Sequence, residues 1–301
     1  MIKCQRKGAY LEVIIPEKWH LHTIEQIFKN HYKVPKKTLH MWRMNKDVFV
    51  NGENIAWNVP LKKQEKLMFP IFKEDSTDIP ATFIDVSILY EDDYLIIANK
   101  PANMDTHPSH PNQEDTLLNA MAFHLLMQGN DGQLQHIHRL DKDTTGAIIF
   151  AKNAFVAALL NRMLEERKIK RTYKALVHGK LQRKKGRIEA PIGRDRHHAT
   201  RRRVSPTGQH AITNFEVLQY DPKKDLTLIQ CQLETGRTHQ IRVHASHIGH
   251  PLAGDTLYGG QPIFPRQALH AYKIRFNHPL TEEIIEVEAP FMDDPEIFPS
   301  E

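Results

Sequence analysis

The chain of 301 residues is long enough for two domains of about 100 to 200 residues each. Hydrophobic residues make up 40% and charged residues 26%, a balance that excludes a disordered tail, a collagen-like repeat and a coiled coil. No apolar run approaches the roughly 18 residues of a membrane span, and the start lacks the apolar core of a signal peptide, so we expect a cytoplasmic protein with no membrane partner.

Charge and cysteine content narrow the class further. The formal net charge is +5, and residues 1–75 hold 14 Lys and Arg against 8 Asp and Glu, so the N-terminal quarter carries the whole excess. A second basic cluster lies within residues 183–203, where Glu189 and Asp195 are the acidic residues. Its basic residues are Arg183, Lys184, Lys185, Arg187, Arg194, Arg196, Arg201, Arg202 and Arg203. Two basic regions favour a nucleic-acid partner over a merely solvated surface. The two cysteines cannot form a disulfide framework or a Cys-rich zinc site.

The first part of the chain predicts a small basic α+β module. Residues 22–33 and 38–46 read as helices, and residues 47–57 read as a strand followed by a hairpin turn at Asn51-Gly52. The polar stretch 72–81 ends in proline and follows an apolar segment, as is typical of a linker. We therefore expect a module over 1–75, a linker over 76–84 and a larger domain over 85–301.

Strands dominate the larger domain. Residues 85–102 predict two strands around a Glu-Asp-Asp turn, 146–153 predict another, and a helix capped by Asn153 follows over 155–168. Further strands are predicted over 171–179, 211–220, 226–234, 269–276 and 283–291. Because few helices cross between these strands, we expect an α+β fold with a mixed or antiparallel sheet and flanking helices, not a parallel doubly wound fold.

Three stretches carry unusually polar residues beside predicted strands: 136–146, 169–179 and 233–260. In the first, Asp141 follows Leu140 and precedes two threonines and a glycine, so it should stand at the entrance of a strand, with Arg139 nearby. A neighbouring arginine favours the ionised form of a carboxylate, which a nucleophile or base requires. Taken alone, the same pattern also fits a loop aspartate paired with a surface arginine.

The segments HRLDKDTTGAIIFAKN and ETGRTHQIRVHASHIGHPLAGDTLYG resemble the RluA-type family of RNA pseudouridine synthases. Further similarity runs through ILYEDDYLIIANKP, KRTYKALVHG, APIGRD and RQALHAYKIRFNHP, and covers roughly residues 85–292. The resemblance implies a pseudouridine-synthase fold and an isomerase that converts uridine in RNA to pseudouridine. The base would leave C1′ of the ribose, rotate and rejoin through C5, with no cofactor and no metal. The resemblance leaves open which RNA is the substrate, with rRNA favoured over tRNA. Separately, we expect a monomer.

The same resemblance assigns roles to four residues. Asp141 matches the catalytic aspartate, which either attacks the anomeric carbon or assists formation of a glycal. Arg242 matches the arginine paired with that aspartate, and Tyr173 matches the tyrosine against the target base. Arg139 would hold the RNA backbone or the partner of the displaced base. Thr238 is predicted to cap a helix that begins there and carries Arg242.

The sequence departs from the family pattern at two places. Asn103 and Met104 stand where the family has glycine and a small apolar residue, and Asn tolerates the positive φ that such a turn requires. The N-terminal module resembles an S4-type RNA-binding domain through its two helices and VFVNGENI, although the usual Arg-Leu-Asp opening is absent.

Two rival interpretations use the same residues. Nineteen histidines suggest a metal hydrolase, with His136 and His138 as one pair and His239, His244, His247 and His250 as another set. The spacing argues against it, because no HExxH motif occurs and the second set would not share one helix face. The other alternative is a catalytically silent RNA-binding or ribosome-assembly factor on the same scaffold.

Overall fold

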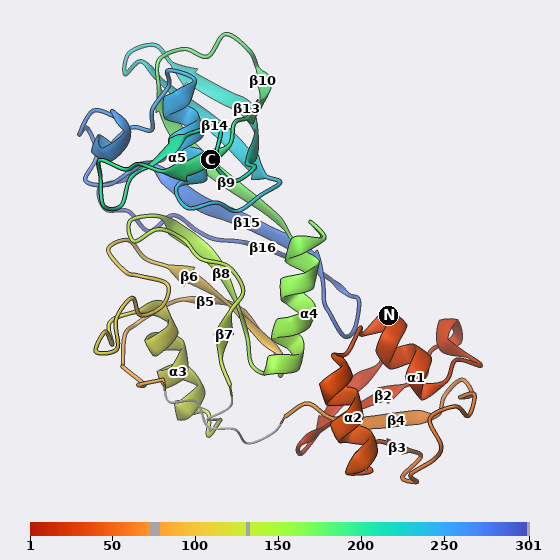
Figure 1. Ribbon diagram of the computed structural model, residues 1–301. Helices are drawn as coiled ribbons and strands as arrows, with labels where there is room; N and C mark the ends of the chain where they lie inside the picture. The colour runs from red at the N-terminus through yellow and green to blue at the C-terminus, as the bar shows by residue number, and fades with distance from the viewer. Residues whose placement is uncertain (73–78, 131–132, 300–301) are drawn as a thin grey trace.

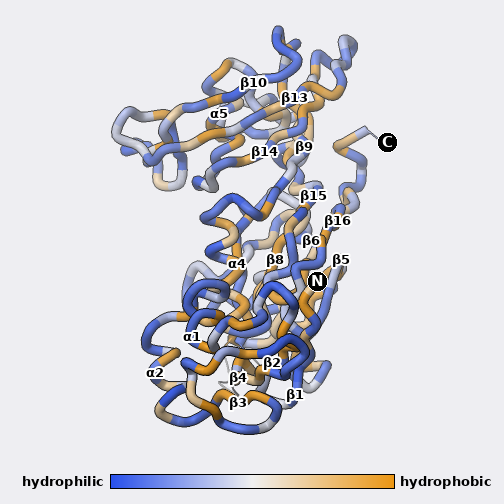
Figure 2. The backbone as a smooth tube through the Cα atoms, turned by 90° about the vertical axis from the view of Figure 1, so that its right-hand side faces the viewer, coloured by the Kyte–Doolittle hydropathy of each residue, from blue (hydrophilic) through white to orange (hydrophobic). Residues whose placement is uncertain are grey.

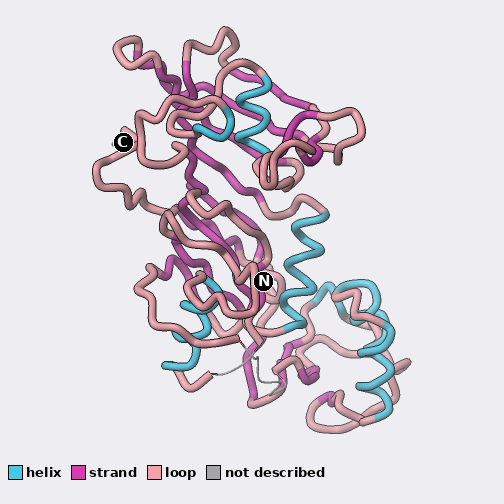
Figure 3. Tube along the Cα trace, turned by 60° about the vertical axis from the view of Figure 1, so that its left-hand side comes forward, coloured by secondary structure: helices cyan, strands magenta, loops and turns pink. Residues whose placement is uncertain are grey.

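A computed structural model of the chain describes residues 1–72, 79–130 and 133–299 (Figure 1). The expected module boundary at 75 and the first part of the expected linker over 76–84 lie outside these described residues. The chain forms a basic module at one end of an elongated molecule and a long twisted sheet that runs through the remainder (Figures 1 and 3).

The N-terminal module packs four short helical segments on a four-stranded antiparallel sheet of order β1-β2-β4-β3. Its strands are β1 (Cys4–Lys7), β2 (Tyr10–Ile14), β3 (Phe49–Val50) and β4 (Lys66–Pro70). Its helical segments are η1 (Glu17–Trp19), α1 (Ile24–Gln26), the π-helical η2 (Ile27–His31) and α2 (Lys36–Met44).

The two helices and the Asn51-Gly52 turn of this module were predicted correctly. Thr23 begins α1 with a capping box, in which its side chain accepts from the Gln26 amide. Asn51 and Gly52 have φ of 52° and 88°, the positive values of a tight hairpin turn. The strand pairing was not predicted: β1 and β2 form a short local hairpin, and β2 pairs with β4 only after the chain has folded back over the helices.

The larger sheet is mixed, as predicted, and contains ten strands within the described residues. Its main path is β10-β13-β14-β9-β15-β8-β6-β5, with β16 paired to β15 and β7 to β8, and β15 and β8 are parallel whereas the other pairs are antiparallel. The strands are β5 (Ile88–Glu91), β6 (Leu95–Lys100), β7 (Gln135–His136), β8 (Thr145–Ala151), β9 (Lys170–His178), β10 (Lys185–Glu189), β13 (Ile212–Asp221), β14 (Leu226–Leu233), β15 (Leu269–Asn277) and β16 (Ile284–Glu288). A separate hairpin joins β11 (Ile192–Arg194) to β12 (Arg202–Val204).

Helices cover this sheet at three places. They are α3 (Leu117–Met127), α4 (Ala154–Glu165) and α5 (Gln240–His247), and a single turn, η3 (Thr256–Tyr258), follows α5. Asn153 caps α4 as expected, since its side chain accepts from the Val156 amide at 2.9 Å. Helix α3 was not predicted, because it is apolar on most sides and lacks the one-sided periodicity of a surface helix.

The N-terminal module and the sheet share one hydrophobic cluster, so they pack directly on each other. Phe155 of α4 contacts Tyr32, Trp42 and Phe69 of the module, with ring centroids 5.5, 6.1 and 5.7 Å apart. Figure 2 shows the hydrophobic residues running along the central strands β6 and β8. Among the described residues, no helix is long and apolar enough to cross a membrane.

Candidate active site

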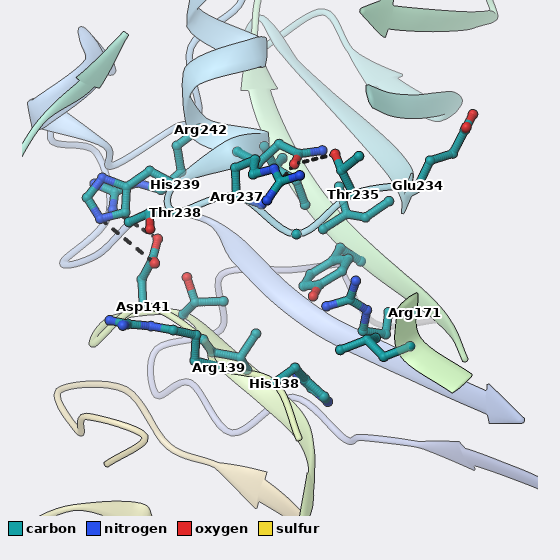
Figure 4. Close-up of a pocket in the computed structure, with 18 of the residues that line it drawn as sticks. His138, Arg139, Asp141, Arg171, Glu234, Thr235, Arg237, Thr238, His239 and Arg242 are labelled. Carbon is teal, nitrogen blue, oxygen red and sulfur yellow. Dashed lines mark hydrogen bonds and ion pairs between the residues drawn. The ribbon is translucent and has the colours of Figure 1, made fainter. Parts of the chain in front are cut away.

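A cleft of about 590 Å³ opens between the segment that follows β7, strands β9 and β14, and the start of α5. One wall is the Asp141 loop, residues 139–144 between β7 and β8, and the opposite wall is the loop from 234 to 239 that leads into α5 (Figure 4). All four residues expected at the site, Arg139, Asp141, Tyr173 and Arg242, line this cleft although they come from separate parts of the chain. Its volume lies in the usual range of ligand pockets, roughly 300 to 1,000 Å³.

Asp141 stands at the entrance of β8, as predicted, and points across the cleft toward α5 (Figure 4). The Thr144 amide donates to the Asp141 carbonyl at 3.0 Å, which closes a turn. Arg242 Nη1 lies 3.1 Å from Asp141 Oδ2, whereas Oδ1 lies 3.8 Å from His239 Nε2. One carboxylate oxygen is therefore held by the arginine, whereas the other makes only the longer contact with His239.

Arg242 is itself anchored by Asp255, a residue that the sequence did not single out. Its Nε and Nη2 donate to the two oxygens of Asp255 at 2.7 and 2.9 Å, and both side chains are buried. Burial alone would lower the pKa of Arg242, but the hydrogen bonds and charge of Asp255, followed by Asp141, raise it above the ordinary value. The guanidinium is thus a fixed cation that joins two carboxylates.

The helix that carries Arg242 begins later than predicted. Its first residue is Gln240 and its N-cap is His239, with φ of 58°, so the expectation that Thr238 caps the helix was wrong. The left-handed conformation turns the chain sharply and brings the His239 ring beside Asp141. His239 Nδ1 bonds the hydroxyl of Tyr258 at 2.8 Å, and burial lowers the pKa of the histidine despite the nearby Asp141.

The loop before α5 is held by one buried glutamine. Gln240 Oε1 accepts from Thr235 Oγ1 at 2.8 Å and from the Arg237 amide at 3.0 Å. Its Nε2 donates to the Ile212 carbonyl at 2.9 Å. Because both ends of one buried side chain are used, this wall of the cleft is tied to β13.

Tyr173 lies on the floor of the cleft and is buried, with 4% of its surface exposed. Burial raises the pKa of its hydroxyl, and Arg171 opposes that change. Arg171 lies two residues earlier on β9, hence on the same face of the strand, and its buried Nε has no hydrogen-bond partner among the described residues. The aromatic ring of Tyr173 thus lies beside a guanidinium with one buried nitrogen that lacks an acceptor among the described residues.

Arg139 is exposed at the mouth of the cleft, and the exposed Arg167 and Arg237 and the half-buried Arg171 also line the cleft. This basic lining suits a polyanion. In the second histidine set of the metal-hydrolase alternative, His244 has no nitrogen free for a metal, because it uses both ring nitrogens, on Thr213 at 2.8 Å and on the Ala190 carbonyl at 2.9 Å. In the part of the chain that the structure describes, no three His, Cys, Asp or Glu residues form a metal-binding group.

Sequence reasoning missed Asp255, Tyr258, His239 and Arg171 as members of the site. Asp255 and Tyr258 lie in the tight loop AGDTLYGG. Gly254 of this loop has φ of 78°, and a Cβ there would lie 2.0 Å from the Arg266 carbonyl oxygen. The sequence offered only a weak signal for these residues. Arg171 lies two residues before Tyr173 on one strand, so both side chains are expected on the same face, whereas nothing in the sequence links position 255 with position 242.

Comparison with protein families identifies the class. The family model described as RNA pseudouridylate synthase matches residues 94–247, and the model described as the RluD ribosomal pseudouridine synthase N-terminal domain matches residues 11–67. The chain belongs to the RNA pseudouridylate synthase family, and within it to the RluA type. It is an isomerase that acts on uridine in RNA.

Individual relatives agree with this assignment. An uncharacterized RNA pseudouridine synthase of Bacillus subtilis, YhcT, is 44% identical over 96% of each chain. Ribosomal large subunit pseudouridine synthase D of Haemophilus influenzae is 37% identical over 90% of this chain and 87% of its own. The solved structure of human RNA Pseudouridylate Synthase Domain Containing 1 has 27% identity and a TM-score of 0.58, and covers 70% of this chain and 86% of its own.

Proposed function

We propose that Asp141 is the catalytic carboxylate of this synthase and that the target uridine flips out of its RNA into the cleft. The observation that carries this proposal is the geometry of Asp141: Oδ2 is held 3.1 Å from the anchored Arg242, while the side chain keeps 19% exposure toward the cleft. A carboxylate with one oxygen fixed and the other accessible can attack the anomeric carbon or remove a proton on the glycal route. Both routes remain open.

The neighbouring residues supply what a flipped base requires. Extrusion of a base costs a few kcal/mol and removes its stacking partners. Tyr173 offers an aromatic side chain at the cleft floor, and Arg171 offers an unused donor beside it. Arg139, exposed at the mouth, is placed to contact the RNA backbone or the partner of the displaced base.

A basic hairpin beside the cleft is the proposed grip on the flanking RNA. Strands β11 and β12 and the loop between them expose Arg194, Arg196, Arg201 and Arg203. Asp195 shapes this loop, because it is buried and accepts from Arg201 Nε at 2.7 Å. The hairpin is tied to the active site through the Arg202 amide, which donates to Tyr258 Oη at 2.8 Å. Phosphate contacts from such a surface would offset the cost of flipping.

The proposed substrate is ribosomal RNA, and the relatives named ribosomal large subunit pseudouridine synthase D support this choice. The S4-like N-terminal module would add a second RNA-binding surface, and the protein would act as a cytoplasmic monomer. We propose no cofactor, because the isomerisation returns the same base to the same ribose and neither consumes nor releases a redox equivalent.

Pseudouridine mapping tests the proposal. Carbodiimide-dependent primer-extension stops would be compared on total RNA from cells with the wild-type protein, a deletion, or Asp141→Ala. Loss of the same rRNA stops in both mutants is the expected result. A stop lost from tRNA alone would overturn the choice of substrate, and stops that persist with Asp141→Ala but vanish in the deletion would overturn the role of Asp141.

The silent-factor alternative predicts a different pattern. A protein that only binds RNA would lose no stop in the deletion, and Asp141→Asn would rescue any growth phenotype completely. If Asp141 is the catalytic carboxylate, the purified wild-type protein should form pseudouridine. The Asp141→Asn protein should then bind the substrate RNA with wild-type affinity and form no pseudouridine.

A further inference from the structure

The Asp141 loop is held in place by polar side chains from outside it. Thr106 Oγ1 accepts from the Leu140 amide and donates to the Leu140 carbonyl, both at 3.1 Å. Lys100 Nζ donates to the Lys142 carbonyl at 2.8 Å, and Arg266 Nη1 donates to the Asp143 carbonyl at 3.1 Å. The residues on both sides of Asp141 therefore have their backbone fixed by segments far away in the sequence.

Arg266 is the most fully used of these side chains. It is buried, and Nε and Nη2 form a bidentate pair with Asp293, each at 2.7 Å. Nη2 also donates to Thr145 Oγ1 at 3.0 Å, and Nη1 also reaches the carbonyls of Gln267 and Leu269 at 2.8 and 2.9 Å. Every nitrogen of the guanidinium has an acceptor. The Arg266 side chain, which holds the Asp141 loop, therefore has little freedom to move.

The Thr145 hydroxyl, which accepts from Arg266, is also held by a hydrogen bond to His270. His270 Nε2 lies 3.0 Å from the Ala289 carbonyl, which can only accept, so this nitrogen carries the proton. Nδ1 is then the acceptor, and the Thr145 hydroxyl donates to it at 2.7 Å. The Thr145 oxygen is left to accept from Arg266, and burial keeps the imidazole neutral by lowering its pKa to about 4.

The anchor of Arg266 comes from the last described part of the chain. Asp293 lies in the segment 289–298, which packs through Ile297 and Phe298 against Leu176 and Leu226. The rings of Phe291 and Phe298 stack with centroids 4.6 Å apart. Both Arg266 and Asp293 lie beyond residue 247, where the match to the family model ends.

We propose that Arg266, anchored by Asp293, is a positioning residue for Asp141, and that the segment 289–298 is thereby part of the support of the active site. This inference rests on the proposed role of Asp141 as the catalytic carboxylate. The guanidinium touches no reacting atom and acts by setting the position of the turn that carries Asp141. A displacement of about 1 Å at a reacting group can cost on the order of 100-fold in rate.

The experiment compares Arg266→Lys with a control that breaks a buried ion pair elsewhere. Lys152→Met removes the pair between Lys152 and Glu91, whose side chains are 6% and 21% exposed and lie outside the cleft. Each variant is assayed for thermal unfolding, for substrate RNA affinity and for the single-turnover rate at saturating enzyme, below the lowest melting temperature. Arg266→Lys keeps the charge but cannot reach all these acceptors with one ammonium.

The expected result is a single-turnover rate about 100-fold lower for Arg266→Lys, with RNA affinity within about 2-fold of wild type. Lys152→Met should lose comparable stability and keep its rate. If Arg266→Lys loses stability but keeps the wild-type rate, Arg266 is only structural and the inference fails. If it does not fold, Asp293→Asn, which leaves the guanidinium in place without its charged anchor, should lower the rate about 10-fold, and a wild-type rate there overturns the inference.

The proposed function fails separately. Asp141→Asn with a wild-type rate would remove the catalytic role of Asp141, whatever the Arg266 variants do. An inactive Asp141→Asn together with a fully active Arg266→Lys would retain the proposed function and reject only the positioning role.

Discussion

Replacing Arg242 by lysine separates charge from geometry at the active site. The guanidinium makes three charge-assisted hydrogen bonds, two to Asp255 at 2.7 and 2.9 Å and one to Asp141 at 3.1 Å. A lysine ammonium is a point donor that cannot match a bidentate carboxylate and also reach a second one. Arg242→Lys therefore loses at least two of the three bonds while the site keeps its positive charge.

The magnitude follows from that count. Hydrogen bonds to charged groups contribute about 1.5 to 3 kcal/mol each, so the free energy of unfolding should fall by about 3 kcal/mol. When the hydrogen bond between residue 242 and Asp141 is lost, the Asp141 carboxylate is no longer held in place, so the single-turnover rate should fall on the order of 100-fold. Urea denaturation measures the first quantity and single-turnover pseudouridine formation the second.

A surface arginine provides the control. Arg275 on β15 is 55% exposed and pairs with Glu286 at 3.1 Å, so Arg275→Lys should change stability by no more than about 1 kcal/mol and leave the rate unchanged. If Arg242→Lys behaved like Arg275→Lys in both assays, charge alone would suffice and the argument from the bidentate geometry would be refuted.

Three further predictions concern the floor of the cleft, acid stability and the module interface. Tyr173→Phe should keep most of the rate and Tyr173→Ala should lose it, because the ring and not the hydroxyl replaces lost stacking; equal loss in a single-turnover assay would contradict this. The buried His270, with a pKa of about 4, stays neutral in the folded protein while the unfolded chain binds a proton near pH 6.5. His270 therefore contributes about 3 kcal/mol to the free energy of unfolding above pH 6.5, and this contribution is lost as the pH falls toward 4. His270→Asn should flatten the pH dependence of the free energy of unfolding in urea between pH 6.5 and 4. Phe155→Ala should destabilise the protein by about 3 to 5 kcal/mol, and an unchanged urea midpoint would show that the module is not held by this contact.

The strands and helices with a clear period could be predicted along the chain. The apolar runs of β9 and β14 and the cap at Asn153 are local properties, so these two strands and α4 followed from neighbouring residues. The turn at Asn103 is also local: its φ of 57° agrees with the expectation that asparagine preserves a conformation usual for glycine. Helix α3 and strand β1 lacked such a period and were missed.

The identity of the chemistry was also contained in the sequence, because Asp141, Arg139, Tyr173 and Arg242 lie in recognisable motifs. Their arrangement in one cleft depends on tertiary structure, since residues 141 and 242 meet only when β8 and α5 approach across the sheet. The anchors of this arrangement, Asp255 and Asp293, carry no local signal. A buried carboxylate is recognisable by the arginine that it neutralises, and only the folded chain pairs Asp255 with Arg242 and Asp293 with Arg266.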